Sequence, residues 1–105
     1  MLDKSKIREM AANYTQAVRQ NYNPKQIILF GLYVNGTPHA NSDIDIAVIF
    51  DHIEGDFLEQ WGGLIRLSAD ISYDIEAHLL DETSNKTGFL EHIQKNGEII
   101  YSSQR

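Results

Sequence analysis

The sequence contains no cysteine, and this absence excludes disulfide bonds, thiolate zinc sites and cysteine nucleophiles. It also lacks any apolar run close to the roughly 20 residues that a membrane-spanning helix needs. The first residues, Met1 to Lys4, lead into a charged segment and not into the apolar stretch of a signal peptide. We therefore expect a cytoplasmic protein with no membrane partner.

Basic residues are scarce as well. The chain has 9 lysines and arginines against 15 aspartates and glutamates, which gives a formal net charge of −6. Because contacts to phosphates supply most of the affinity for nucleic acids, such an acidic chain is not expected to bind nucleic acid alone. The length of 105 residues, without repeats or a linker, favours a single domain over residues 1–105.

The spacing of apolar residues predicts helices and strands in the order α-β-β-α-β-α-β. Helices are expected over residues 3–22, from an Asp56 cap through Phe57 to Ser68, and over 88–96; strands are expected over 26–30, 43–50, 71–79 and 98–101. This order is typical of an α/β (α+β) fold in which helices flank a mixed sheet of about four strands.

Two adjacent glycines, Gly62 and Gly63, interrupt the middle helix. They are expected to cost about 2 kcal/mol relative to alanines. Either the helix is weak at this point, or another element packs closely against the glycines, and the sequence leaves both readings open.

The first residues of the predicted strand 43–50 carry a chemical signal. Because side chains alternate along a strand, Asp43 and Asp45 share one face, while the apolar residues at even positions face a core. Two neighbouring carboxylates repel each other, and a divalent cation such as Mg²⁺ or Mn²⁺ would relieve that repulsion. Solvated acids, or an Asx turn at Asp43 after Ser42, would explain the same residues without a metal.

A glycine-containing turn from Gly31 to Gly36 precedes the two aspartates and follows an apolar strand. Glycine lets the backbone approach a ligand closely, and backbone N–H groups in such a turn can bind a phosphate. Metal ligands beside a phosphate-binding turn indicate nucleotide chemistry.

This stretch resembles the minimal nucleotidyltransferase (MNT) family of the polymerase β superfamily. The family signature is Gly-Ser, ten further residues, and then Asp-x-Asp. Here Gly31-Leu32 is followed after ten residues by Asp43-Ile44-Asp45, so the spacing matches, while Leu32 replaces the serine. The resemblance implies a nucleotidyltransferase fold and a nucleotide site at Gly31, Leu32, Gly36 and Ser42.

The resemblance also implies three catalytic, metal-binding acids: Asp43, Asp45 and Asp74, with two Mg²⁺ or Mn²⁺ ions. A two-metal site needs a third carboxylate from a neighbouring strand. Asp74 is expected in the middle of the strand 71–79 and on its polar face, which it would share with Glu76 and His78. Glu76 is the second choice for this role, and His78 is expected to be solvated.

The implied activity is transfer of a nucleoside monophosphate, AMP from ATP first of all, to a hydroxyl group. In the resembled family the acceptor is a tyrosine of an all-helical HEPN-type partner, and the pair behaves as toxin and antitoxin. Leu32 cannot donate the hydrogen bond that a serine would give a phosphate, so the alternative is a catalytically impaired module that neutralises a partner by covering it. The sequence identifies neither the acceptor nor whether the chain forms a homo-oligomer.

Overall fold

The computed structural model describes residues 4–30, 44–84 and 87–103. In chain order the elements are α1 (Lys4–Asn21), β1 (Gln26–Phe30), β2 (Ile44–Phe50), α2 (Phe57–Ile71), β3 (Ile75–Asp81), a short 3₁₀ helix η1 (Glu82–Ser84), α3 (Phe89–Asn96) and β4 (Glu98–Ser102). This confirms the predicted order of helices and strands. Among the described residues, no helix is long and apolar enough to cross a membrane.

The four strands form one mixed sheet in the order β3-β2-β1-β4. Strand β1 runs antiparallel to both β2 and β4, whereas β2 and β3 are parallel. The register places Asp45 between Phe30 on β1 and Glu76 on β3. Residues that lie far apart in the sequence are therefore brought together near the start of β2.

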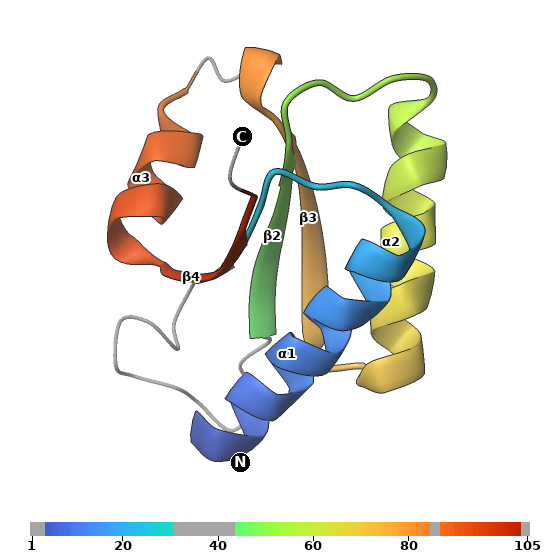
Figure 1. The fold of residues 1–105 in the computed structure, drawn as a ribbon, viewed down its shortest axis with the longest axis vertical. Helices are drawn as coiled ribbons and strands as arrows, with labels where there is room; N and C mark the ends of the chain where they lie inside the picture. The colour runs from blue at the N-terminus through green and yellow to red at the C-terminus, as the bar shows by residue number, and fades with distance from the viewer. Residues whose placement is uncertain (1–3, 31–43, 85–86, 104–105) are drawn as a thin grey trace.

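Helices cover both faces of the sheet (Figure 1). Buried side chains of α1 and α2, such as Tyr14 and Leu64, join the even-numbered β2 residues in one apolar cluster. On the other face, Leu90 and Ile93 of α3 pack with Ile28, Ala47 and Ile49. Asp45 belongs to this second face because it precedes Ala47 by two residues in the strand.

Helix α2 begins as predicted, because the Asp56 side chain accepts hydrogen bonds from the backbone N–H groups of Leu58 and Glu59. The close approach at its glycines occurs at one position only. A Cβ atom on Gly63 would clash with the Tyr22 hydroxyl, whereas at Gly62 the nearest atom belongs to Arg66 at 3.8 Å. Tertiary packing therefore requires the second glycine and not the first.

Two hydrogen bonds tie α2 to its neighbours. The buried Tyr14 hydroxyl donates to the Leu64 carbonyl at 3.0 Å, and the Trp61 indole N–H donates to the Ala77 carbonyl on β3 at 2.9 Å. Burial raises the pKa of the Tyr14 hydroxyl, which therefore stays a donor. Both bonds fix α2, and with it β3, against the rest of the fold.

The prediction that a strand begins at Ile71 is wrong. Ile71 is the last residue of α2, a turn follows, and β3 begins at Ile75. Tyr73 would alternate with Asp74 in the predicted strand and face away from its polar side, but its side chain is 92% exposed. Apolar residues alternate without interruption from Ile71 to Leu79, so the pattern alone does not show that its first residues complete a helix and a turn.

Candidate functional site

Asp45 is the half-buried exception in a strand that is otherwise buried on both faces. Its side chain is 22% exposed and lies on the same face as α3. A carboxylate in such a position loses part of its hydration and needs a compensating partner. Asp45 is therefore the residue from which the site is built.

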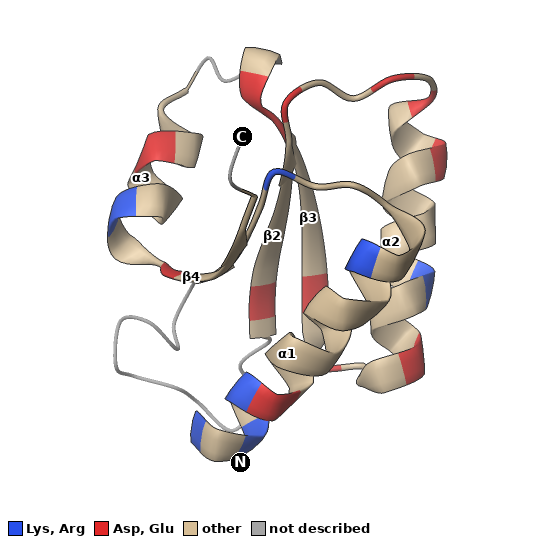
Figure 2. Cartoon of the chain, viewed as in Figure 1, with Lys and Arg blue, Asp and Glu red and all other residues tan. Residues whose placement is uncertain are grey.

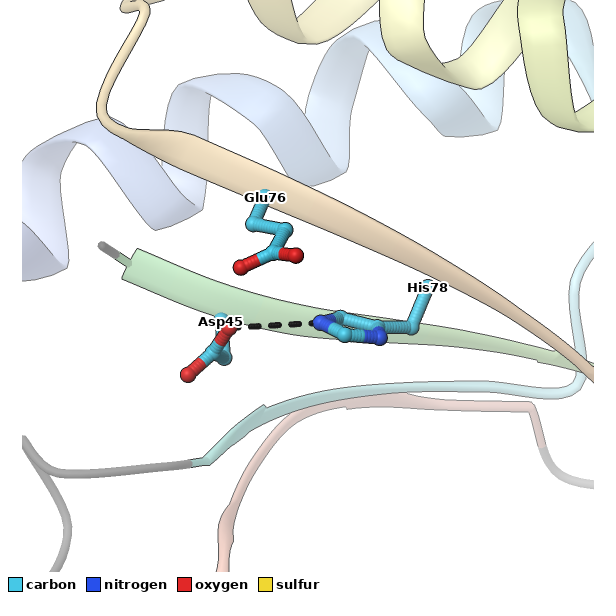
Figure 3. Close-up of side chains that lie close together, drawn as sticks. All are labelled: Asp45, Glu76 and His78. Carbon is cyan, nitrogen blue, oxygen red and sulfur yellow. Dashed lines mark hydrogen bonds and ion pairs between the residues drawn. The ribbon is translucent and has the colours of Figure 1, made fainter.

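Two side chains of β3 lie beside Asp45: Glu76 and His78 (Figure 3). One ligand atom from each of the three residues can be chosen so that all lie within 4.8 Å of one another. Nε2 of His78 is 3.2 Å from Oδ1 of Asp45. Because an ionised carboxylate only accepts hydrogen bonds, the histidine is the donor in this pair.

His78 is held in place by its surroundings. Its ring packs edge-on against Phe30, with centroids 5.0 Å apart, and its side chain is 32% exposed. It is paired with Ala47 in the register, and the small alanine side chain leaves room for the ring to turn toward Asp45. The prediction of a solvated histidine is wrong. Positions 76 and 78 are two residues apart in a strand, so their side chains share one face, and this alternation is the signal in the sequence that indicates the cluster.

Asp74 occupies a different position from the one predicted. It lies in the turn before β3, where its carboxylate accepts a hydrogen bond from the Ser72 hydroxyl at 3.4 Å. Its backbone carbonyl accepts a hydrogen bond from the N–H of Ile44 at 2.6 Å, which places Asp74 where the parallel strands β2 and β3 begin. The structure thus groups Glu76, and not Asp74, with Asp45.

The remaining predicted site residues lie outside the described residues: Gly31, Leu32, Gly36, Ser42 and Asp43. Asp43 precedes the first described residue of β2, Ile44. Of the three predicted acids, the structure therefore describes only Asp45 and Asp74.

The donor set of the cluster fits a divalent cation. Two carboxylates bring negative charge, and the imidazole adds a nitrogen ligand. Neighbouring donors around a six-coordinate ion lie about 3 Å apart, so ligand atoms within 4.8 Å need only small side-chain rotations to converge.

A second aspartate–histidine pair lies where β3 ends. Nδ1 of His52 is 3.5 Å from Oδ2 of Asp81, beside a cavity of about 680 Å³ that Phe57 and Phe89 also line. Asp81 accepts hydrogen bonds from the Thr83 hydroxyl and from the backbone N–H groups of Ile53 and Thr83. These bonds, that of the Thr83 hydroxyl most strongly, lower the pKa of the Asp81 carboxyl.

Comparison with known protein families identifies most of the chain. Residues 12–105 match the family described as polymerase beta, nucleotidyltransferase. The match includes β1, β2 and β3, and therefore every residue of the cluster.

Among characterised proteins, the chain is similar to the protein adenylyltransferase MntA of Shewanella oneidensis. The two are 33% identical over 90 residues, which cover 84% of this chain and 62% of MntA. The chain thus corresponds to less than two thirds of that relative's length.

Solved structures show the same fold. A structure from Sulfolobus solfataricus, assigned as a nucleotidyltransferase, has a TM-score of 0.72 at 19% identity and covers 96% of this chain and 85% of its own. A structure described as a toxin-antitoxin with AMP-PNP has a TM-score of 0.63 at 30% identity, with coverage of 98% and 76%. A structure of the toxin-antitoxin MntA-HepT has a TM-score of 0.63 at 26% identity, with coverage of 92% and 74%.

Proposed function

The chain belongs to the polymerase beta nucleotidyltransferase family, and from this premise we propose that it transfers AMP from ATP to a hydroxyl group. The observation that carries the proposal is the pair of carboxylates, Asp45 and Glu76, side by side across two parallel strands within the family match. The similarity to a toxin-antitoxin structure that contains AMP-PNP supports ATP as the nucleotide.

The proposed metal ligands come from β2 and β3. Asp43 and Asp45 would hold Mg²⁺ or Mn²⁺ from one strand, and the third carboxylate would come from the other. Glu76 takes this third role in the proposal because it lies opposite Asp45, with Asp74 in the adjoining turn as the competing candidate. When bound, two such ions would neutralise the triphosphate and lower the pKa of the attacking hydroxyl.

The chain's own residues would orient the reactants. Backbone N–H groups around Gly31, Leu32 and Gly36, with Ser42, are proposed to hold the outer phosphates of the nucleotide. The carboxylates would keep the acceptor oxygen in line with the bond that breaks, so that pyrophosphate leaves opposite the incoming hydroxyl. The face of β2 that carries Asp45 would thus serve as the platform for transfer.

We propose a tyrosine of an all-helical, HEPN-type partner as the acceptor, with this chain as the antitoxin. The support is the similarity to MntA, a protein adenylyltransferase, and to the MntA-HepT toxin-antitoxin structure. Within the described residues, the helices and strands all belong to the sheet and its covering layers, and none of them forms a separate acceptor domain.

Transfer of radioactive label tests the proposal. The chain is incubated with ATP labelled on the α-phosphate, a divalent cation and the all-helical, HEPN-type partner that the proposal requires. We expect label on the partner with the unmodified chain and none with Asp45→Asn. Changing the accepting tyrosine to phenylalanine should remove the label as well. Absence of label with the folded, unmodified chain would contradict the proposal.

A second function, inhibition by binding alone, is favoured by Leu32. A hydrogen bond to a charged group contributes about 1.5–3 kcal/mol, so losing the serine could cost about tenfold to a hundredfold in rate. Under this alternative, the double variant Asp43→Ala/Asp45→Ala still inhibits its partner. Under the transfer proposal it binds the partner but no longer inhibits it, and Leu32→Ser increases the transfer rate.

A further inference from the structure

We propose that His78 is a direct ligand of the bound cation, and that the site therefore prefers ions with affinity for imidazole, such as Co²⁺ or Zn²⁺, over Mg²⁺. This inference rests on the proposed function in one respect, because it assumes that the Asp45 and Glu76 carboxylates hold a cation. It adds a nitrogen ligand and a preference between metals that three acids alone would not provide.

The distances carry the first step. Nε2 of His78 is 3.2 Å from Oδ1 of Asp45, and the cluster can be completed with Glu76 within 4.8 Å. Two ligands at neighbouring positions, each about 2.1 Å from an octahedral ion, are separated by about 3 Å. An ion could therefore contact both atoms close to their present separation. An imidazole ligates through its unprotonated nitrogen, so Nε2 would give up the proton that it donates to Asp45, and Nδ1 would carry the N–H of the ring.

The support for the imidazole is the second step. Phe30 packs edge-on against the ring, and the strand register places His78 beside Ala47. Only 32% of the side chain is exposed, so the ring samples fewer orientations than one on an open surface. Ligands that neighbouring residues hold in position lose less conformational entropy when the ion binds.

The chemistry of the donors is the third step. Mg²⁺ prefers oxygen ligands and retains several of its waters, whereas imidazole nitrogen suits Zn²⁺ and its neighbours among the transition metals. Replacing one oxygen position by imidazole therefore lowers the relative affinity for Mg²⁺. The two carboxylates still provide the negative charge that any divalent ion requires.

Calorimetric titration with Co²⁺ alone and with Mg²⁺ alone tests this assignment. We expect tighter binding of Co²⁺ by the unmodified chain, and a loss of at least about tenfold in Co²⁺ affinity in His78→Gln. The affinity for Mg²⁺ should change by less than about twofold. His92→Gln is the matched control, because His92 is exposed on α3 and its ring contacts Asn96; this variant should bind both ions like the unmodified chain.

A measurement on the unmodified chain avoids any effect of the substitution on folding. Nuclear magnetic resonance signals of the His78 ring should broaden at substoichiometric Co²⁺, before those of His92. Undiminished His78 signals while Co²⁺ binds would overturn the inference, as would absence of Co²⁺ binding. An equal loss of Co²⁺ and Mg²⁺ affinity in His78→Gln would also overturn it, because it would show that His78 only orients Asp45.

The label-transfer and Co²⁺-binding experiments together separate this inference from the proposed function. Transfer to the partner together with Co²⁺ binding that does not depend on His78 would refute His78 as a metal ligand and would still support the proposed transferase activity. Co²⁺ binding that depends on His78, without transfer to the partner, would support His78 as a metal ligand and refute the proposed transferase activity.

Discussion

The two ends of the β2–β3 strand pair each place an aspartate beside a histidine, yet the surroundings of the two aspartates differ. At one end Asp45 contacts His78 and lies next to Glu76. At the other end Asp81 contacts His52 and accepts hydrogen bonds from Ile53 and Thr83. Figure 2 shows acidic residues at both ends, so charge alone does not distinguish them.

Hydrogen-bond donors make the difference. The negative charge of Asp81 stabilises the turn after β3, and nearby Lys25 pairs with Asp51 at 3.4 Å and with Glu82 at 2.9 Å. Those carboxylates contribute to structure, and a metal ion would have to displace their partners. Asp45 instead faces another carboxylate across the strands. An acid beside a second acid is the better candidate for binding a cation.

The largest expected effect is on transfer activity, which should distinguish the two ends of the β2–β3 strand pair. Asp45→Asn should reduce transfer of the α-phosphate label by at least about a hundredfold, because a lost metal contact is worth several kcal/mol in the transition state. Asp81→Asn, at the structural end, should retain activity close to that of the unmodified chain. Comparable losses in the two folded variants would show that the ends do not differ in function.

Stability should follow the opposite order. Asp81→Ala removes the acceptor for the backbone N–H groups of Ile53 and Thr83, and we expect it to lower the free energy of unfolding by about 1–3 kcal/mol. Asp45→Ala relieves repulsion with Glu76 and should change that free energy by less than about 1 kcal/mol. Urea unfolding of both variants measures the difference; a larger loss for Asp45→Ala would reverse our assignment.

Acid should weaken the structural end. The pKa of Asp81 is lowered from 3.8 in the folded chain, so its charged form favours folding. This contribution is present above the unfolded pKa and is lost as the pH falls below about 4 and through the folded pKa. Unfolding followed between pH 5 and pH 2 should show a shallower loss of stability in Asp81→Asn than in the unmodified chain; parallel curves would contradict this role for Asp81.

The smallest effect concerns α2, which packs against β3 and α1. Gly62→Ala meets only ordinary contacts and should raise the free energy of unfolding by about 0.5–1 kcal/mol. Gly63→Ala forces Tyr22 away from its edge-on contact with Phe50 and should give a less stable protein than Gly62→Ala. Thermal unfolding of the two variants compares them directly, and equal stabilisation by both would mean that Tyr22 moves at no cost.

Much of the fold follows from local patterns. Strand β1 occupies the predicted residues 26–30, and α2 starts at the predicted cap. These predictions succeed because they depend on periodicity and on one side chain bonding to nearby backbone. The start of β3 is not predicted correctly because the period-two pattern continues through the turn at Tyr73 and Asp74.

The site is harder to predict because it depends on contacts between strands. The Asp-x-Asp spacing after the glycine-containing turn identifies Asp45, and the alternation along the next strand places Glu76 and His78 on one face. The parallel register, which pairs Asp45 with Glu76 and brings His78 within hydrogen-bond distance, is a property of the folded sheet. The same holds for Asp81, whose partner Ile53 is 28 positions away in the sequence.

ATP binding measured by calorimetry in the presence of Mg²⁺ tests the central claim most directly. The unmodified chain and Asp81→Asn should bind ATP in a manner that requires the metal, and Asp43→Ala/Asp45→Ala should lose that binding while remaining folded. Binding that is independent of both the metal and the two aspartates, or no binding by the folded unmodified chain, would contradict a nucleotide site at this end of the sheet.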